Sequence, residues 1–342
     1  MGLYLLLLII GIVALVAAGR FVSRALVTIA HVLGVSEFVI AFFLLAFSTT
    51  IPEFFVGISA ALAGAPTLSL GDVIGSNIIN LTLIAGSVIL IGRKDIPIAG
   101  EITRKQGLWI FGVGSLPVFL IFDGVLSRYD GILLLVIFFV YLTRLAKEKR
   151  LVLGAVGGEM TEGIGKSPNM FARIKFFGNS EDGKRFMGAI LVFALGVALL
   201  IIGAKLVVDS AQRIAVLLGV SQFIIGLFLI AFGTSVPELA FGIRAAFAKS
   251  PETSIGDVLG AVALNSSWVL GVVALLHPIV PAALGMTVFS GIFMIAVFAA
   301  FFFLMNRGGV LYPREGLALI ILYILFFAGM LVFGNATAPL AQ

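Results

Sequence analysis

Long apolar segments, separated by short polar stretches, dominate the pattern of hydrophobic and polar positions along this chain. A helix needs roughly 20 apolar residues to cross the hydrocarbon core of a bilayer, and the segments come close to or exceed that length. The pattern therefore predicts an all-α membrane protein with ten transmembrane helices. They are expected near 3–29, 35–63, 69–92, 104–123, 129–146, 186–217, 220–247, 254–276, 285–305 and 315–334.

One longer polar stretch, 147–185, divides the predicted helices into two sets of five. Its glycines and mixed charges are typical of a linker. Because five is an odd number, the second set would enter the membrane from the opposite side, so the halves are predicted to be inverted repeats. The predicted organisation is a first five-helix repeat over 1–146, a linker over 147–185 and a second five-helix repeat over 186–342.

The basic residues support this topology. With the N-terminus outside, 19 of the 22 lysines and arginines fall on the cytoplasmic side, and only Arg128, Lys205 and Arg213 fall outside. Such an excess of positive charge is the usual mark of the cytoplasmic side. We therefore predict a multi-pass protein of the cell membrane with both termini outside and the linker in the cytoplasm.

Composition agrees with a membrane protein. The 342 residues are 61% hydrophobic and 11% charged, with a mean hydropathy of +1.21, whereas soluble domains carry about 25% charged residues. The chain has no cysteine, which excludes disulfides, thiolate metal sites and cysteine nucleophiles. The net charge of +5 is modest, and we expect no nucleic-acid partner.

The strongest chemical signal is an internal repeat. Residues 34–53 return as 219–238, 185 residues later and without a gap, with 12 of 20 positions identical. Each copy places a proline and a glutamate in the middle of an apolar segment. A carboxylate in lipid is costly, and a proline inside a helix frees backbone groups. Because the chain carries a glutamate and a helix-breaking proline at matching places in both copies, we infer one polar site built from two halves, as in duplicated secondary transporters.

The prolines, Pro52 and Pro237, predict broken second and seventh helices. The loosened turns would expose carbonyls near Ala46 and Ala231, and each turn also carries two hydroxyl side chains just before the glutamate. Carboxylate, hydroxyl and carbonyl oxygens are hard ligands that suit Na⁺ or Ca²⁺. A kinked span with one glutamate could be structural, but two at a matching offset favour an ion site.

A partner motif follows in the next predicted helix of each half, at 71–80 and again at 256–265. Its paired glycines would allow close helix contact. Its asparagines, Asn80 and Asn265, could coordinate an ion or brace the glutamates. The aspartates of the motif, Asp72 and Asp257, are expected in the first helical turn, where a carboxylate stabilises the start of a helix. Ion binding by these aspartates is the less favoured alternative.

These motifs resemble those of a known family. Thr-Thr-Ile-Pro-Glu53 and Thr-Ser-Val-Pro-Glu238, each followed by Gly-Asp-Val-x-Gly, resemble the repeated motifs of the cation/Ca²⁺ exchanger superfamily, and most of all those of prokaryotic sodium/calcium exchangers. The motif match covers 34–86 and 219–271. The resemblance implies antiport of Ca²⁺ against Na⁺ through four central helices, with the first and sixth spans sliding across them.

The resemblance also implies a set of ion ligands, centred on the two glutamates of the repeat. The implied ligands are Glu53 and Glu238, the hydroxyl or carbonyl oxygens of Thr49, Thr50, Thr234 and Ser235, the carbonyls of Ala46 and Ala231, and the side chains of Ser76, Asn80 and Asn265.

Two positions depart from the family pattern, because the family usually has a serine at Ala261 and often an aspartate at Asn265. A methyl group cannot coordinate Na⁺. The centre is then expected to hold two carboxylates, whose charge matches one Ca²⁺ or two monovalent ions and disfavours a third Na⁺. Protons remain an alternative to Na⁺, because two adjacent buried glutamates favour proton binding.

Other classes of function fit less well. A cation channel could use the same acids, but acidic selectivity rings usually come from symmetric subunits, whereas one chain here supplies both halves and can act as a monomer. A membrane enzyme is not expected, because the chain has no His-Glu-x-x-His, Gly-x-Ser-x-Gly or phosphate-loop motif. No cofactor is expected, since Ca²⁺, Na⁺ and H⁺ would be substrates.

Overall fold

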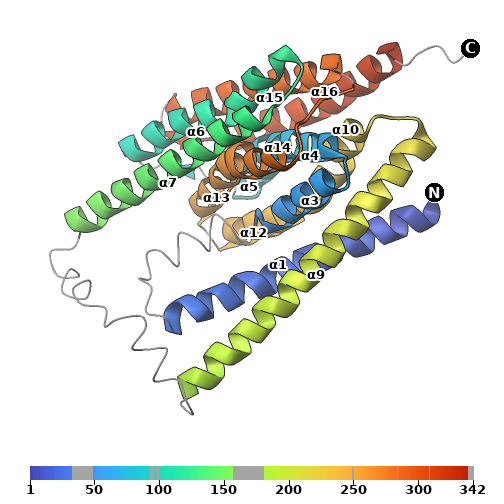
Figure 1. Ribbon diagram of the computed structural model, residues 1–342. Coiled ribbons are helices and arrows are strands. Elements are labelled where there is room, and N and C mark those ends of the chain that lie inside the picture. Colours follow the sequence, from blue (N-terminus) through green and yellow to red (C-terminus); the bar gives the residue numbers. More distant parts are fainter. Residues whose placement is uncertain are drawn as a thin grey trace, which may run out of the picture.

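The computed structural model describes residues 1–32, 49–92, 96–97, 100–156, 181–248, 250–282, 284–307 and 309–337. These ranges are mostly helical, as predicted (Figure 1). In chain order the elements are α1 (Gly2–Val32), α3 (Ile51–Leu62), α4 (Pro66–Ile79), η1 (Asn80–Ile84), α5 (Ala85–Gly92), β1 (Ile96–Pro97), α6 (Gly100–Leu120), η2 (Ile121–Asp123), α7 (Arg128–Val156), α9 (Glu181–Leu218), α10 (Gln222–Ile224), η4 (Ile225–Ile230), α11 (Ala231–Thr234), α12 (Val236–Phe247), α13 (Pro251–Leu264), η5 (Asn265–Val269), α14 (Leu270–Leu276), α15 (Leu284–Asn306), β2 (Val310–Leu311) and α16 (Pro313–Thr337).

Six helical stretches in the described part of the chain are long and apolar enough to cross a membrane. A seventh arises if the bent pair Gln222–Thr234 and Val236–Phe247 counts as one span. The six stretches are Gly2–Ala30, Pro66–Gly92, Gly183–Leu218, Pro251–Leu276, Leu284–Asn306 and Pro313–Val332.

The helices form three layers (Figure 1). Helices α1 and α9 cross each other on one side, α6, α7, α15 and α16 lie on the other, and the remaining helices lie between them. Burial follows this arrangement, because 78% of the apolar window is buried in both Pro66–Gly92 and Pro251–Leu276, against 33% in α1 and 22% in α9. The centre is therefore shielded, and α1 and α9 expose leucine and isoleucine side chains as lipid-facing helices do.

The central elements repeat along the chain. Helices α3 and α12 begin and end 185 residues apart, as do α4 and α13, and the π-helical turns η1 and η5. In all four of these helices a proline occupies one of the first two positions, where its missing N–H leaves no hydrogen bond unmade. The sequence repeat is thus matched by a repeat of local structure.

Glycines allow the central helices to touch backbone to backbone. A Cβ added at Gly71 would lie 2.2 Å from the carbonyl oxygen of Phe223, and one at Gly75 would lie 2.1 Å from that of Leu227. The predicted close contact is confirmed for this copy of the motif. The equivalent neighbours of the second copy, 38–42, lie outside the described residues.

Short β contacts join loops that are distant in sequence. Strands β1 and β2 pair antiparallel, with Ile96 opposite Leu311. A second, isolated bridge joins Leu126 to Ile279. Each contact links a loop of the first half to a loop of the second half.

The helices flanking the predicted linker extend into it. Helix α7 continues to Val156, and α9 already begins at Glu181. These ends carry charged residues, which favour helix as readily as apolar ones do, so hydropathy alone ends the first of these helices too early and starts the second too late. Residues 157–180 lie outside the description.

Candidate ion-binding site

The predicted break in the seventh span is present. Helices α11 and α12 meet at Ser235 and differ in direction by 41°. Pro237 is the second residue of α12, so the new helix begins where proline is tolerated. In the first half, α3 begins after a turn at Thr49 and Thr50. The segment before that turn, which includes Ala46, lies outside the described residues.

The two glutamates of the repeat lie in the interior. Glu53 is 0% exposed and Glu238 is 1% exposed. Within the described part of the chain, neither oxygen of either carboxylate has a hydrogen-bond partner. Glu53 lies close enough to Glu238 and to Asp72 for their negative charges to repel. Buried carboxylates without partners are costly, so this region is suited to a cation or a proton.

Hydroxyl groups from both halves meet at Asp72. Thr234 Oγ1 donates to Asp72 Oδ1 at 3.1 Å, and Ser76 Oγ donates to the same oxygen at 3.4 Å. The two hydroxyl oxygens are 3.5 Å apart. Ser76 and Thr234, both predicted ligands, are therefore brought together across the two halves.

The prediction for Asp72 and Asp257 was wrong. Neither stands in the first turn of its helix: among described residues the first turn of α4 has no acid, and in α13 it holds Glu252. Both aspartates lie deeper, and both are buried. Helices α4 and α13 begin at prolines upstream of the apolar run, and this helix-start signal would have placed the aspartates in the interior.

The asparagines open the π-helical turns, since η1 starts at Asn80 and η5 at Asn265. Such turns occur often at functional sites. Neither amide atom of Asn80 has a partner in the described region. Asn265 Nδ2 donates to Asn77 Oδ1 at 3.5 Å, and Asn77 Nδ2 donates to Ser266 Oγ at 2.8 Å. This chain of contacts leaves the Oδ1 atom of Asn265 available to a ligand.

The hydroxyls of Thr49 and Ser235 are less engaged than those of Ser76 and Thr234. Thr49 lies near the carboxylates of Glu238 and Asp257. Its Oγ1, like the Oγ of Ser235, is buried and has no hydrogen-bond partner among the described residues. Thr50 is fully buried. The side chain of Ala261 offers no donor or acceptor here.

The carbonyl of Ala231 is more occupied than the predicted loosening implies. It accepts a hydrogen bond from the backbone N–H of Ser235 at 3.1 Å, and Thr234 Oγ1 lies 3.4 Å from it. A carbonyl oxygen has two lone pairs, so one direction remains available for a cation.

Carboxylates alone do not make an ion site in the described part of the chain. In the part of the chain that the structure describes, no three acidic or histidine side chains come close enough to hold one ion among themselves. A bound ion would also be coordinated by hydroxyl, amide and carbonyl oxygens, which are the hard ligands that Na⁺ and Ca²⁺ prefer.

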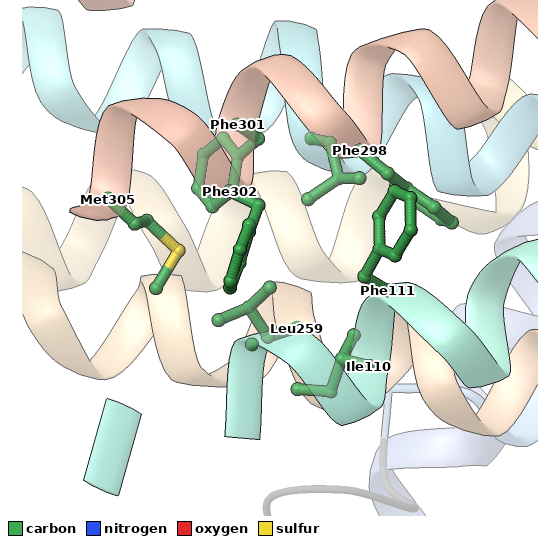
Figure 2. A pocket seen from close by; sticks show the side chains of 9 residues that line it. Ile110, Phe111, Leu259, Phe298, Phe301, Phe302 and Met305 are labelled. Carbon is green, nitrogen blue, oxygen red and sulfur yellow. The ribbon is translucent and has the colours of Figure 1, made fainter. Parts of the chain in front are cut away.

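A separate pocket is apolar (Figure 2). It lies between α6 and α15, and Leu259 of α13 also lines it. No ionisable or hydroxyl side chain lines it, so it offers a bare cation nothing to replace water. Its labelled lining residues are Ile110, Phe111, Leu259, Phe298, Phe301, Phe302 and Met305.

Comparison with known proteins finds a family. The sequence profile described as "Sodium/calcium exchanger protein" matches residues 3–147 and 188–332. The matched ranges cover both halves and leave out the middle of the chain.

Two relatives illustrate the match. The sodium/calcium exchanger MaX1 of Methanosarcina acetivorans is 29% identical over 349 residues, covering 94% of this chain and 96% of the relative. The inner membrane protein YrbG of Escherichia coli is 29% identical over 279 residues, covering 80% of this chain and 79% of the relative.

Solved structures share the fold. One of the sodium-calcium exchanger NCX_Mj aligns with a TM-score of 0.60 at 25% identity, covering 95% of this chain and 97% of the other. The H⁺/Ca²⁺ exchanger CAX aligns with a TM-score of 0.71 at 16% identity, covering 95% and 82%. The latter likeness concerns the fold alone.

Proposed function

Because the chain belongs to the sodium/calcium exchanger protein family, we propose that it is a secondary active antiporter that exchanges Ca²⁺ for monovalent cations, with Na⁺ as the main counter-ion. One observation carries the proposal. Each half contributes a fully buried glutamate, Glu53 or Glu238, whose oxygens have no partner among the described residues and whose charges lie close enough to interact. The protein is not an enzyme in this proposal, since no bond is made or broken.

The proposed topology has ten transmembrane helices in two inverted repeats, with the termini outside and the linker in the cytoplasm. The matching bounds of α3 and α12, and of α4 and α13, support the repeat. The β contacts between loops of the two halves fit the same relation. The charge bias along the chain supports the orientation.

The proposed ligand set joins both halves around the glutamates. The structure supports it by bringing Ser76 and Thr234 together and by leaving oxygens of Asn80 and Asn265 without partners in the described region. The proposed ligands are Glu53, Glu238, Thr49, Thr50, Thr234, Ser235, Ser76, Asn80, Asn265 and the carbonyls of Ala46 and Ala231, of which Ala46 lies outside the described residues.

The buried charge explains why exchange would be obligatory. An empty site would carry unpaired carboxylates through the occluded state, which costs several kcal/mol per ion. A bound cation removes that cost and lets the protein switch between inward-open and outward-open states. In the proposed motion α1 and α9 slide over the centre. Among the described residues, apolar side chains such as Leu15, Val207 and Ile230 pack together at their interface with it.

Protons are the second candidate counter-ion. Buried carboxylates that lack hydrogen-bond partners can be neutralised by protons as well as by metal ions. The two counter-ions predict different driving gradients, so transport measurements separate them.

The direct test is uptake of radiolabelled Ca²⁺ into proteoliposomes that contain the purified protein. We expect an outward Na⁺ gradient to drive uptake. Uptake driven only by a pH gradient would replace Na⁺ by H⁺. Entry of Ca²⁺ down its own gradient without any counter-ion would indicate a channel and refute the proposal.

Neutral variants test the glutamates themselves. We expect Glu53→Gln and Glu238→Gln to abolish exchange while the protein still folds. Each removes a charge that faces a buried cation, a loss of about 3 kcal/mol or more, which corresponds to binding weakened by at least about a hundredfold. The control is Glu252→Gln, an exposed glutamate of α13. Normal exchange by a glutamate variant would remove the basis of the proposal.

A further inference from the structure

Two more carboxylates lie beside the glutamates. Asp72 of α4 and Asp257 of α13 occupy matching positions 185 residues apart, and they are 0% and 3% exposed. Each keeps one oxygen, Oδ2, that has no hydrogen-bond partner in the described part of the chain. Full burial of a carboxylate with one oxygen unsatisfied requires an explanation.

These aspartates belong to the same region as the glutamates. Asp72 accepts a hydrogen bond from Thr234 of the opposite half. Its charge acts on both Glu53 and Glu238, and the charge of Asp257 acts on Glu238. Among the described residues, Glu238 therefore interacts electrostatically with Glu53, Asp72 and Asp257, and Glu53 also interacts with Asp72.

Positive charge from the protein does not balance them. Among the described residues, no lysine, arginine or histidine contacts any of the four carboxylates. Four buried acids without a basic partner are unfavourable unless something else supplies the charge. In an ion transporter, the transported cations can supply it.

We propose that Asp72 and Asp257 are ligands of the transported cations, so that the region offers four carboxylates and takes up to four compensating positive charges, as one divalent cation with monovalent cations or as monovalent cations alone. The four carboxylates would be divided among more than one ion, because no three of these described acids come close enough to hold a single ion. This inference rests on the proposed function. It revises the expectation of a centre with two carboxylates, which disfavoured a third monovalent ion.

The two aspartates are not equivalent. Ser76 lies one turn after Asp72 and donates to its Oδ1, so Asp72 is braced by two hydroxyls. The residue in the place of Ser76 in the second half is Ala261, which has no hydroxyl. Asp257 is therefore less satisfied by the protein and more available to a cation. On this proposal, alanine at position 261 leaves Asp257 without the hydroxyl donor that would otherwise compete with a cation for its carboxylate.

A purely structural role is the alternative, in which Asp72 only braces the broken helix through Thr234. An asparagine separates the two roles, because its carbonyl oxygen still accepts from Thr234 and Ser76 while the charge is gone. Asp72→Asn and Asp257→Asn are thus the informative variants. Asp123→Asn, at an exposed acid of η2, is the matched control.

The experiment measures the dissociation constant for Ca²⁺ of the detergent-purified full chain, from Ca²⁺-dependent thermal stabilisation and radiolabelled Ca²⁺ binding. We expect Asp72→Asn and Asp257→Asn to weaken binding by about tenfold or more, because Ca²⁺ affinity follows the number of charged ligands. The control should bind as the unmodified protein does. An unchanged dissociation constant in both folded variants would overturn the inference.

Two further arms keep the result decisive. If the asparagine variants do not fold, Asp257→Glu, which displaces the carboxylate by one methylene, is compared instead, and unchanged affinity again overturns the inference. If the unmodified protein binds no Ca²⁺, the proposed function fails. Thermal stabilisation of the same variants is then measured with Na⁺, Li⁺, K⁺ and Mg²⁺. The inference holds only if the variants are stabilised less than the unmodified protein by the cation that binds.

Discussion

At the scale of single residues, one amide orients another. Asn77 accepts from the Nδ2 of Asn265 and donates to Ser266, so the NH₂ group of Asn265 is held away and its Oδ1 has no hydrogen-bond partner in the described part of the chain. A cation needs the oxygen of an amide and is repelled by its NH₂ group. Asn77 therefore acts as a positioning residue, although it is not a proposed ligand.

Replacing Asn77 by valine tests this role. Valine is the residue that the second half carries at the matching position, Val262, so the substitution suits a central helix. We expect the apparent KM for Ca²⁺ to rise about fivefold, since a hydrogen bond contributes about 1 kcal/mol, while the maximal rate changes less. Radiolabelled uptake over a range of Ca²⁺ concentrations measures both.

The control for Asn77→Val is Ser290→Ala. Its hydroxyl is also buried, and it donates within α15 to the carbonyl of Met286 at 2.8 Å. Loss of that bond should leave KM unchanged. An equal rise in KM for both variants would mean that general destabilisation, and not the orientation of Asn265, is responsible.

The sequence predicts some of these residues and not others. Glu53 and Glu238 are conspicuous because an unpaired acid in an apolar segment is expensive, and its repetition excludes chance. Asn77 has no counterpart in the second half, so the repeat gives no signal for it. Its importance comes from contact with Ser266, 189 positions away, which only the packing of the helices reveals.

At the scale of elements, the site is built where helices depart from regular geometry. The bent pair Gln222–Thr234 and Val236–Phe247 changes direction at Ser235, and the two π-helical turns begin at the candidate ligands Asn80 and Asn265. Pro237 predicts the bend, because proline has no backbone N–H to donate to the carbonyl four residues earlier. No residue type predicts a π-helical turn. These two turns could not be predicted from the sequence, because such turns depend on tertiary packing.

Restoring the helix at the bend should stop transport. Alanine at position 237 can donate to the carbonyl of Gly233, which favours one continuous helix through Ser235. We expect Pro237→Ala to keep or raise the thermal midpoint and to reduce Ca²⁺ exchange strongly, because a displacement of about 1 Å in a ligand set can cost a hundredfold in rate. Thermal denaturation and uptake are measured on the same preparation.

Pro251→Ala is the matched control, because Pro251 starts α13 and interrupts nothing. This variant should retain exchange. If Pro237→Ala also transports normally, the bend is not needed for the site.

At the scale of the whole molecule, α1 and α9 form a pair with its own packing. Ala14 of α1 lies 3.4 Å from the point where a Cβ on Gly203 of α9 would stand. The pair also touches the centre, where Ile12 Cγ1 lies 3.0 Å from the corresponding point of Gly233. In the proposed motion the first contact persists and the second changes.

Cross-links distinguish the two contacts, and the absence of native cysteine makes them unambiguous. Cβ atoms of a disulfide lie about 3.5–4.5 Å apart. The Cβ of Ala14 lies 3.4 Å from the Gly203 position, and in the second pair the atom near Gly233 is Cγ1 of Ile12, which is bonded to its Cβ. We expect oxidation of Ile12→Cys/Gly233→Cys to stop Ca²⁺ exchange and a reductant to restore it. Oxidised Ala14→Cys/Gly203→Cys should still exchange. Full activity of the first pair when cross-linked, as checked by a shift on a non-reducing gel, would refute the sliding motion.

The contact between Asn77 and Ser266 also bears on the origin of the chain. An ancestral half could have assembled as an antiparallel pair of identical copies. In a pair of first halves, Asn77 would face Leu81, the counterpart of Ser266, and in a pair of second halves Ser266 would face Val262. Neither combination restores the bond. In the proposed inverted-repeat arrangement, the two halves are therefore complementary at this contact, and neither half paired with a copy of itself would reproduce the geometry at Asn265.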